Sequence, residues 1–245
     1  MKAITLTLLI GVLISACGGG GGDSGGSYKT PPISDSTVMP NLRKVNLDSI
    51  GNFYALDSRN DGHLHGKIKH WKHSPVDDVL VPVKIDAVPN VSEALERIEK
   101  KLGYAVFDRE AIEGLSDEEI DYGLIFREGT ALGPEGEPDP NNCGHVGAKD
   151  GSIRYERDWQ GTDGTPKVAL SVNIGNGLSN SKCKPTVGLV IHEVMHALGM
   201  QGHFEGFGWG RNLNHENDMA YTVLYNIYHH EPGTPEEELD LQLPY

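Results

Sequence analysis

The pattern of hydrophobic and polar positions divides the chain into strands, helices and one long polar loop. Residues 79–88 alternate apolar and polar side chains and are rich in valine, which predicts a strand. A helix is expected next, capped by Ser92 and stopped by Gly103, because the apolar residues between them recur at helical spacing. Residues 131–151 are dense in Gly, Pro, Asn and Asp and therefore predict a loop. Further strands are predicted at residues 104–107, 122–126, 152–157 and 168–174.

The clearest helical pattern begins just after residue 186. Its apolar residues recur every three or four positions, as on the buried face of a helix: Val187, Val190, Ile191, Val194, Met195 and Leu198. Thr186 is expected to cap this helix and Gly199 to stop it. Residues 234–238 open like a further capped helix. This order of elements predicts an α+β fold with one sheet, with α/β as the alternative.

The N-terminus has a different pattern. Lys2 precedes an almost wholly apolar run over residues 3–14, which is too short for a membrane span and fits the core of a signal peptide. The run ends in small residues before Cys17, and the sequence I-S-A-C resembles the lipobox of bacterial lipoproteins. The segments that we expect are a signal peptide with its lipidation site at residues 1–17, a flexible Gly-, Ser- and Pro-rich tether at 18–41, and one folded domain at 42–245.

The lipobox resemblance also implies a location. It places the protein in the bacterial cell envelope, held to a membrane by a lipid on Cys17. No acidic residue directly follows Cys17. By resemblance to lipoprotein sorting in Gram-negative bacteria, this favours the outer membrane, with the domain either periplasmic or exposed at the surface.

Charge and cysteine content narrow the picture further. The 245 residues carry a formal net charge of −14. An acidic surface repels phosphate backbones, so nucleic acid is not an expected partner. Cys143 and Cys183 are expected to form a disulfide, since the inferred compartment is oxidising. The bridge would close a loop of about 40 residues and contribute about 4 kcal/mol by loop entropy.

Candidate chemistry lies on the helix after Thr186. His192, Glu193 and His196 form the arrangement H-E-x-x-H, which places two imidazoles one turn apart on the same helix face, where both can bind one zinc ion. Glu193 is then close enough to accept a proton from a zinc-bound water while that water attacks a carbonyl group. A catalytic zinc site needs a third protein ligand and keeps one position for water.

The stretch from His192 to His203 resembles the metzincin metallopeptidases, whose pattern is H-E-x-x-H-x-x-G-x-x-H. Gly199 matches, while His203 stands one residue later than the pattern puts the third histidine. The family also has a methionine turn beneath the metal, here Met219-Ala220-Tyr221. The resemblance implies His203 as third zinc ligand, Met219 as the floor of the site and Tyr221 as a stabiliser of the oxyanion.

The same resemblance implies the whole design of the enzyme. It predicts a mixed sheet, an active-site helix and a smaller, irregular C-terminal lobe. It also implies a zinc endopeptidase with one catalytic Zn2+ and a protein or peptide substrate. In this family the substrate adds to a strand edge above the cleft, and residues 168–174 are expected near that edge.

Several alternatives stay open. Glu216, at the spacing of thermolysin-like enzymes, and His215 are the other candidates for third ligand. The protein would otherwise be a non-catalytic zinc-binding lipoprotein, or a zinc amidase that acts on cell-wall peptides. The presence of Glu193 argues against the first of these, since a structural site needs no such carboxylate. The histidines near Trp71 are expected in a solvated segment, with a second metal site as the alternative: His63, His65, His70 and His73.

Overall fold

A computed structural model provides the fold. It describes residues 32–48, 65–73, 79–85, 88–129, 143–149, 165–166, 169–175, 183–209 and 218–244. Some predicted features lie outside these ranges: the signal peptide with Cys17, the strand at residues 152–157, and the alternative ligands His215 and Glu216.

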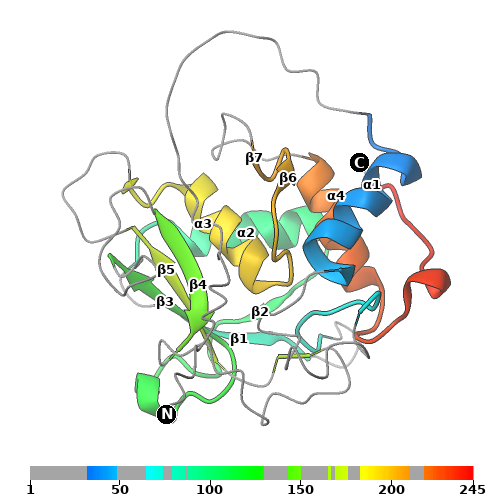
Figure 1. Ribbon diagram of the computed structural model, residues 1–245. Coiled ribbons are helices and arrows are strands. Elements are labelled where there is room, and N and C mark those ends of the chain that lie inside the picture. Colours follow the sequence, from blue (N-terminus) through cyan, green and yellow to red (C-terminus); the bar gives the residue numbers. More distant parts are fainter. Residues whose placement is uncertain are drawn as a thin grey trace, which may run out of the picture.

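A five-stranded mixed sheet forms one layer of the fold (Figure 1), and its strands are β1 (Val81–Lys84), β2 (Phe107–Asp108), β3 (Leu124–Glu128), β4 (Gly144–Ala148) and β5 (Leu170–Ile174). Their order across the sheet is β2-β1-β3-β5-β4. β2, β1, β3 and β5 run parallel, whereas β4 pairs antiparallel with β5 and sets Val146 opposite Val172. β4 is therefore an edge strand of the described sheet.

The strand predictions were partly correct. β1, β3 and β5 overlap the runs predicted at residues 79–88, 122–126 and 168–174, and β2 begins at the last residue of the run at 104–107. The loop predicted for residues 131–151 was wrong over β4, because pairing with β5 organises a glycine-rich segment that has no strand pattern of its own. β5, expected near a substrate-binding edge, lies next to the edge strand β4, and its relation to a substrate stays a prediction.

The described residues form four α-helices: α1 (Asp35–Leu42), α2 (Val91–Leu102), α3 (Val187–Ala197) and α4 (Asp218–His229). A π-helical turn, η1 (Arg43–Leu47), follows α1, and short 3-10 turns are η3 (Asp117–Glu119) and η6 (Glu236–Glu238). The predicted α+β class is confirmed. In this part of the chain, no helix is both long and apolar enough to cross a membrane.

The predicted helix before Gly103 is confirmed as α2, with a different start. Its apolar stripe is buried: Ala94, Leu95, Ile98 and Leu102. The cap residue is Asn90, with a φ of 66°, and not the expected Ser92. Gly103 ends the helix with a φ of 84°, a conformation that favours glycine.

Helix α1 lies inside the predicted tether. Val38 and Leu42 are fully buried on its inner face, which packs against α4. Packed structure therefore begins several residues before the expected domain start at residue 42. The predicted helix at residues 234–238 is only the 3-10 turn η6.

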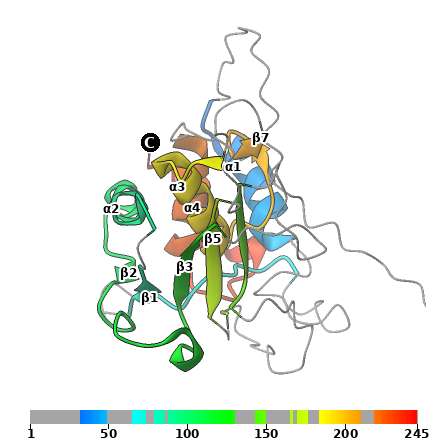
Figure 2. The same cartoon turned by 90° about the vertical axis from the view of Figure 1, so that its left-hand side faces the viewer.

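The helices gather on one side of the sheet in both Figure 1 and Figure 2. α3 packs on β4 and β5, α2 packs on α3, and both α1 and α2 contact α4. The main core fills the space between them. A smaller cluster under the opposite sheet face consists of Ile112, Ile120, Ile125 and Ala169. This arrangement places α3 in the middle of the protein, beside the edge strand.

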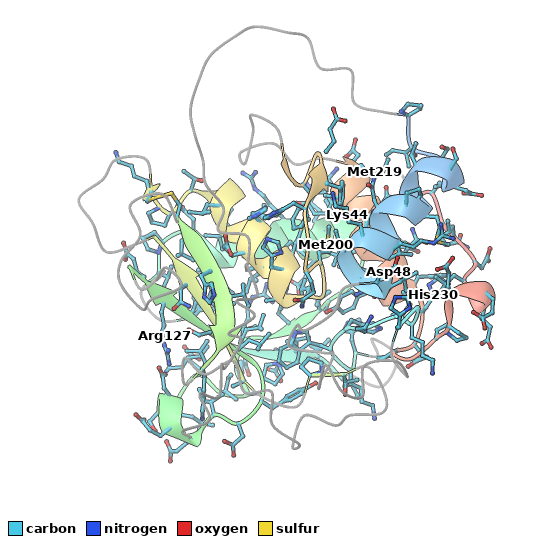
Figure 3. All side chains as sticks on the ribbon, viewed as in Figure 1. Lys44, Asp48, Arg127, Met200, Met219 and His230 are labelled. Carbon is cyan, nitrogen blue, oxygen red and sulfur yellow. A yellow bond between two sulfur atoms is a disulfide. The ribbon has the colours of Figure 1, made fainter. Side chains whose placement is uncertain are left out.

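A polar network fixes η3 on that opposite side of the sheet. The carboxylate of Asp117 accepts hydrogen bonds from Lys84 Nζ at 2.7 Å and from Arg127 at 2.7 Å. Figure 3 shows Arg127 well away from Met200, which follows α3. The network therefore stabilises the fold at a distance from the residues that carry the candidate chemistry.

Candidate metal centre

Helix α3 begins and ends as its sequence predicts. The Thr186 hydroxyl accepts a hydrogen bond from the Leu189 backbone N–H at 3.2 Å and so caps the first turn. At the other end Gly199 has a φ of 118°. A Cβ atom at Gly199 would come within 2.6 Å of the Lys69 carbonyl oxygen, so the chain leaves the helix through a space that only glycine fits.

Three histidine side chains converge at the end of this helix. Their Nε2 atoms are 3.1 Å apart for His192 and His196, 3.0 Å for His196 and His203, and 3.3 Å for His192 and His203. A tetrahedral metal ion with bonds of 2.0–2.1 Å separates its nitrogen ligands by about 3.3 Å. The three nitrogens therefore fit a single metal ion, and this is the one such cluster among the described residues.

His203 reaches the other two histidines through a turn that is held from outside. The Trp71 indole donates a hydrogen bond to the Ala197 carbonyl at 2.7 Å, and the Asn46 side-chain amide donates to the Gly199 carbonyl at 2.9 Å. The Gln201 backbone N–H donates to the Val45 carbonyl at 2.7 Å. These contacts hold the turn between α3 and His203 against Trp71 and η1.

The orientation of His196 is fixed by its own turn. Its Nδ1 donates a hydrogen bond to the Met200 carbonyl oxygen, because a carbonyl oxygen can only accept. This bond leaves the Nε2 lone pair directed at the two other histidines. A ligand histidine anchored in this way has its tautomer chosen before the metal binds.

Burial keeps the three imidazoles neutral. It lowers the pKa of His196 to about 3, with His203 as the next cause. The pKa of His192 is also well below its usual range, through burial and then through His196 and His203. The pKa of His203 is lowered by burial and then by Lys44. Neutral imidazole is the form that binds a metal ion.

Glu193 is the buried carboxyl group of the site. Its side chain is 1% exposed, and Oε1 has no hydrogen-bond partner among the described residues. Burial raises the pKa of Glu193 to about 8. Such a group costs free energy to keep in the interior and is more typical of a functional site than of a structural one.

The carboxyl group of Glu193 lies against the edge strand. A Cβ atom at Gly144 would come within 2.3 Å of Glu193 Oε1 and 2.4 Å of Cδ. The disulfide between Cys143 and Cys183, predicted from the sequence, is present. It joins the residue before Gly144 to the segment that leads into α3, and so links the edge strand to the helix that carries Glu193.

The other predicted site residues lie on α4. Met219 is in the first turn of this helix and fully buried, so it does not form a turn between elements (Figure 3). Tyr221 is also fully buried, and its ring lies under Lys101 Nζ at 5.3 Å. The roles expected for these two residues at a metal stay predictions.

Two buried histidines near Trp71 differ from the sequence-based expectation. His70 and His73 are 1% and 7% exposed, so the expectation of a solvated segment was wrong for both. His70 Nε2 bonds to the His230 carbonyl and His73 Nε2 to the Ala105 carbonyl. These bonds give both residues a packing role.

Sequence reasoning missed Gly144 and Phe207. Gly144 lies in a segment read as a loop, and its contact with Glu193 depends on how β4 pairs. Phe207 packs against the histidines, but no catalytic motif includes it. The available signal was the closely spaced aromatic and glycine residues of F-E-G-F-G-W just after His203.

Comparison with known proteins finds no relative of this chain. No protein-family model, no curated protein and no solved structure matches the chain. The site is therefore interpreted from its own residues.

Proposed function

We propose that the protein is a zinc-dependent endopeptidase of metzincin-like design. The observation that carries the proposal is the convergence of three buried imidazoles, two of them on α3, together with a buried carboxyl group on that helix, Glu193, whose Oε1 has no hydrogen-bond partner among the described residues. A structural zinc site has four protein ligands and needs no such carboxyl group. The three ligands found among the described residues, together with a buried acid next to His192 in the sequence, are the donor set of a hydrolytic site.

Zinc is the metal that suits these ligands best. Imidazole nitrogens bind zinc, copper, iron and nickel, whereas magnesium and calcium prefer oxygen. Separations of 3.0–3.3 Å between the nitrogens are compatible with bonds of zinc length from all three to one ion. When bound, zinc lowers the pKa of a water molecule to about 7 and polarises the carbonyl group under attack.

Glu193 is proposed as the general base. It accepts the proton of the attacking water and passes it to the leaving amine of the peptide. Burial raises the pKa of Glu193 to about 8 in the metal-free site, and a zinc ion nearby would favour the ionised form that acts as the base. Among the described residues, Glu193 Oε1 has no hydrogen-bond partner, so this atom can take part in the reaction.

The edge strand β4 is the proposed binding site for the peptide. One of its sides pairs with β5, and we propose that its other side, an outer edge of the described sheet, takes an extended chain as an added strand. Glu193 touches this strand at Gly144, so the general base would lie beside the bound peptide. The substrate in this proposal is a protein or peptide of the bacterial cell envelope, where a lipid on Cys17 would hold the enzyme.

The test combines metal content with hydrolysis. The full chain is purified, dialysed and measured for zinc, and its hydrolysis is followed with a mixture of quenched fluorescent peptides. We expect one zinc per chain, lost in His192→Ala. Glu193→Ala should keep the zinc and lose hydrolysis, because it removes the base and leaves the three ligands intact.

The contrary results are specific. A wild-type chain that takes up no zinc would overturn the proposal. Zinc binding with equal hydrolysis in wild type and Glu193→Ala would show that Glu193 is not the base, and zinc binding with no hydrolysis in either would leave a non-catalytic metal protein. Hydrolysis of cell-wall peptides only, abolished in Glu193→Ala, would keep the mechanism and change the substrate class.

A further inference from the structure

A short turn follows the third histidine and folds back over the site. Residues 204–209, named the capping turn below, contain β6 (Phe204–Glu205) and β7 (Gly208–Trp209). Phe204 and Phe207 exchange two backbone hydrogen bonds of 2.9 Å, which close the turn. Both side chains are buried, at 2% and 4% exposure. The turn is thus a closed unit with two apolar side chains.

Phe207 contacts all three histidine rings. Its ring centroid is 4.7 Å from that of His192, 5.0 Å from His196 and 5.8 Å from His203. The three histidine centroids are themselves 4.6–5.2 Å apart. No point in the plane of the three histidine centroids lies at all three of these distances from them, so the centroid of Phe207 lies outside that plane. The phenyl ring therefore lies over one face of the histidine triangle, so that the four rings form a near-regular tetrahedron.

The backbone of the capping turn also touches the site. A Cβ atom at Gly208 would come within 1.9 Å of His203 Cδ2, so the imidazole ring lies directly on the bare Cα of Gly208. Gly208 has a φ of 75°, which favours glycine. His203 is therefore held by Phe207 from one direction and by Gly208 from another.

We infer that Phe207 is a positioning residue of the metal centre, which closes one face of the histidine triangle to water and fixes the three rings for the metal. The inference rests on the proposed function, because it assumes that the histidines bind a metal. It assigns the apolar floor of the site to Phe207, a role that the metzincin resemblance implied for Met219 on α4.

The physical effect follows from rigidity and from exclusion of water. Three imidazoles that can rotate must be ordered when the metal binds, and this ordering lowers the affinity. A phenyl ring in contact with all three reduces that cost. It also covers one face of the triangle, so added water ligands cannot enter from the Phe207 side.

The experiment compares two phenylalanines of the same turn. Phe204 is as buried as Phe207 and packs on it at 5.7 Å, but has no ring contact with the three histidines in the described structure. Phe207→Ala and Phe204→Ala are made in the full chain, with Phe207→Leu as a variant that keeps most of the buried volume. Zinc affinity is measured by competition with a chelator, and the visible absorption spectrum is recorded with cobalt(II).

We expect Phe207→Ala to weaken zinc binding about 10–100-fold, the usual range for residues that support metal ligands. The visible bands of four-coordinate cobalt should weaken as water enters the coordination shell. Phe207→Leu should fall between wild type and Phe207→Ala. Phe204→Ala should lose stability but keep both the affinity and the cobalt spectrum, because it leaves the contacts with the rings in place.

The failures of the two proposals are distinguishable. Equal zinc affinity and equal cobalt spectra in Phe207→Ala and Phe204→Ala would overturn the positioning role, even with the metal site intact. Wild-type zinc affinity in both Phe207→Leu and Phe207→Ala would also overturn the positioning role. A wild-type chain without zinc or cobalt binding would instead overturn the proposed function.

Discussion

The carboxyl group of Glu193 lies so close to the Cα atom of Gly144 that no side chain fits between them. Gly144→Ala should therefore displace the carboxyl group. We expect zinc content to stay at the wild-type level and hydrolysis to fall about 100-fold, since an error of about 1 Å in a reacting group has an effect of that size.

Gly114→Ala is the matched control for this variant, because a Cβ atom at Gly114 meets no other atom within 4 Å. It should retain activity. Full hydrolysis by Gly144→Ala, measured on the same fluorescent peptides, would show that the position of Glu193 is not critical.

Measurements of zinc affinity in alanine variants can identify the third zinc ligand. His203 completes the cluster in the structure, whereas the sequence also left Glu216 and His215 open. His203→Ala should weaken zinc binding at least 100-fold, and Glu216→Ala and His215→Ala should leave it unchanged. Chelator competition measures all three. At zinc concentrations of about 100 times Kd, the wild type should also gain about 2.7 kcal/mol of stability, a gain that His203→Ala lacks.

The disulfide between Cys143 and Cys183 should contribute strongly to stability. It spans 40 residues, and loop entropy predicts about 4 kcal/mol for such a loop. Reduction should lower Tm by about 10 °C. A double Cys→Ser variant serves as the control: it should melt at the temperature of the reduced wild type and show no response to reductant. Identical melting of the reduced and oxidised wild type would contradict the expectation.

Asn46 connects two distant parts of the fold. Its amide nitrogen donates one hydrogen bond to the Lys69 carbonyl at 2.6 Å and one to the Gly199 carbonyl at 2.9 Å. Both hydrogen bonds are buried. Asn46→Ala leaves both carbonyl groups without this donor. We expect a loss of about 2–4 kcal/mol in the free energy of unfolding, measured with urea on the metal-free protein.

Asn46→Ala should also weaken zinc binding, because Gly199 begins the turn that carries His203. Ile120→Ala is the control for general destabilisation. Ile120 is 1% exposed and belongs to the small cluster under the opposite sheet face. That variant should lose stability and keep its zinc affinity. An equal loss of zinc affinity in Asn46→Ala and Ile120→Ala would argue against a specific role for Asn46.

His70 makes the metal-free protein sensitive to acid. Burial lowers the pKa of His70 to about 4, against opposing hydrogen bonds to the His230 and Trp71 carbonyls. Between this value and the unfolded value near 6.5, the unfolded chain binds more protons than the folded one. Stability should therefore fall as the pH is lowered from 6.5 towards 4, by about 3 kcal/mol from this group.

His70→Gln removes the titrating group, so its unfolding free energy should depend less on pH by up to about 1.4 kcal/mol per unit in that window. Urea unfolding at a series of pH values measures the difference. The same pH slope in both proteins would mean that folding does not lower the pKa of His70, so that below about pH 6.5 both ring nitrogens donate to the Trp71 and His230 carbonyl oxygens.

The sequence predicted the elements whose pattern is local. α2 and α3 were found because their apolar residues recur at helical spacing, and the histidine pair followed from α3. α1 was missed because Pro40 and the neighbouring linker composition are typical of an extended segment, while the burial of Val38 and Leu42 depends on α4. α4 was missed because its first turn was read as a methionine turn.

The candidate site divides in the same way. His192, Glu193 and His196 could be recognised from spacing along one helix. His203 could only be proposed, because its position depends on the turn that Asn46, Trp71 and η1 hold from outside. Gly144 and Phe207 belong to elements that reach the site through the fold of the whole chain, and no local pattern marks them.

Three glycines constrain how this sequence can change over time. Gly144, Gly199 and Gly208 lie in three separate segments, and each has a neighbour where a Cβ atom would be: Glu193, the Lys69 backbone and His203. A methyl group would meet Glu193 at Gly144 and His203 at Gly208, and at Gly199 it would meet the Lys69 backbone beside the turn that carries His203. Lineages that retain the metal centre should therefore keep all three glycines through divergence that replaces most of the surface, and loss of any one should accompany loss of a histidine or of Glu193.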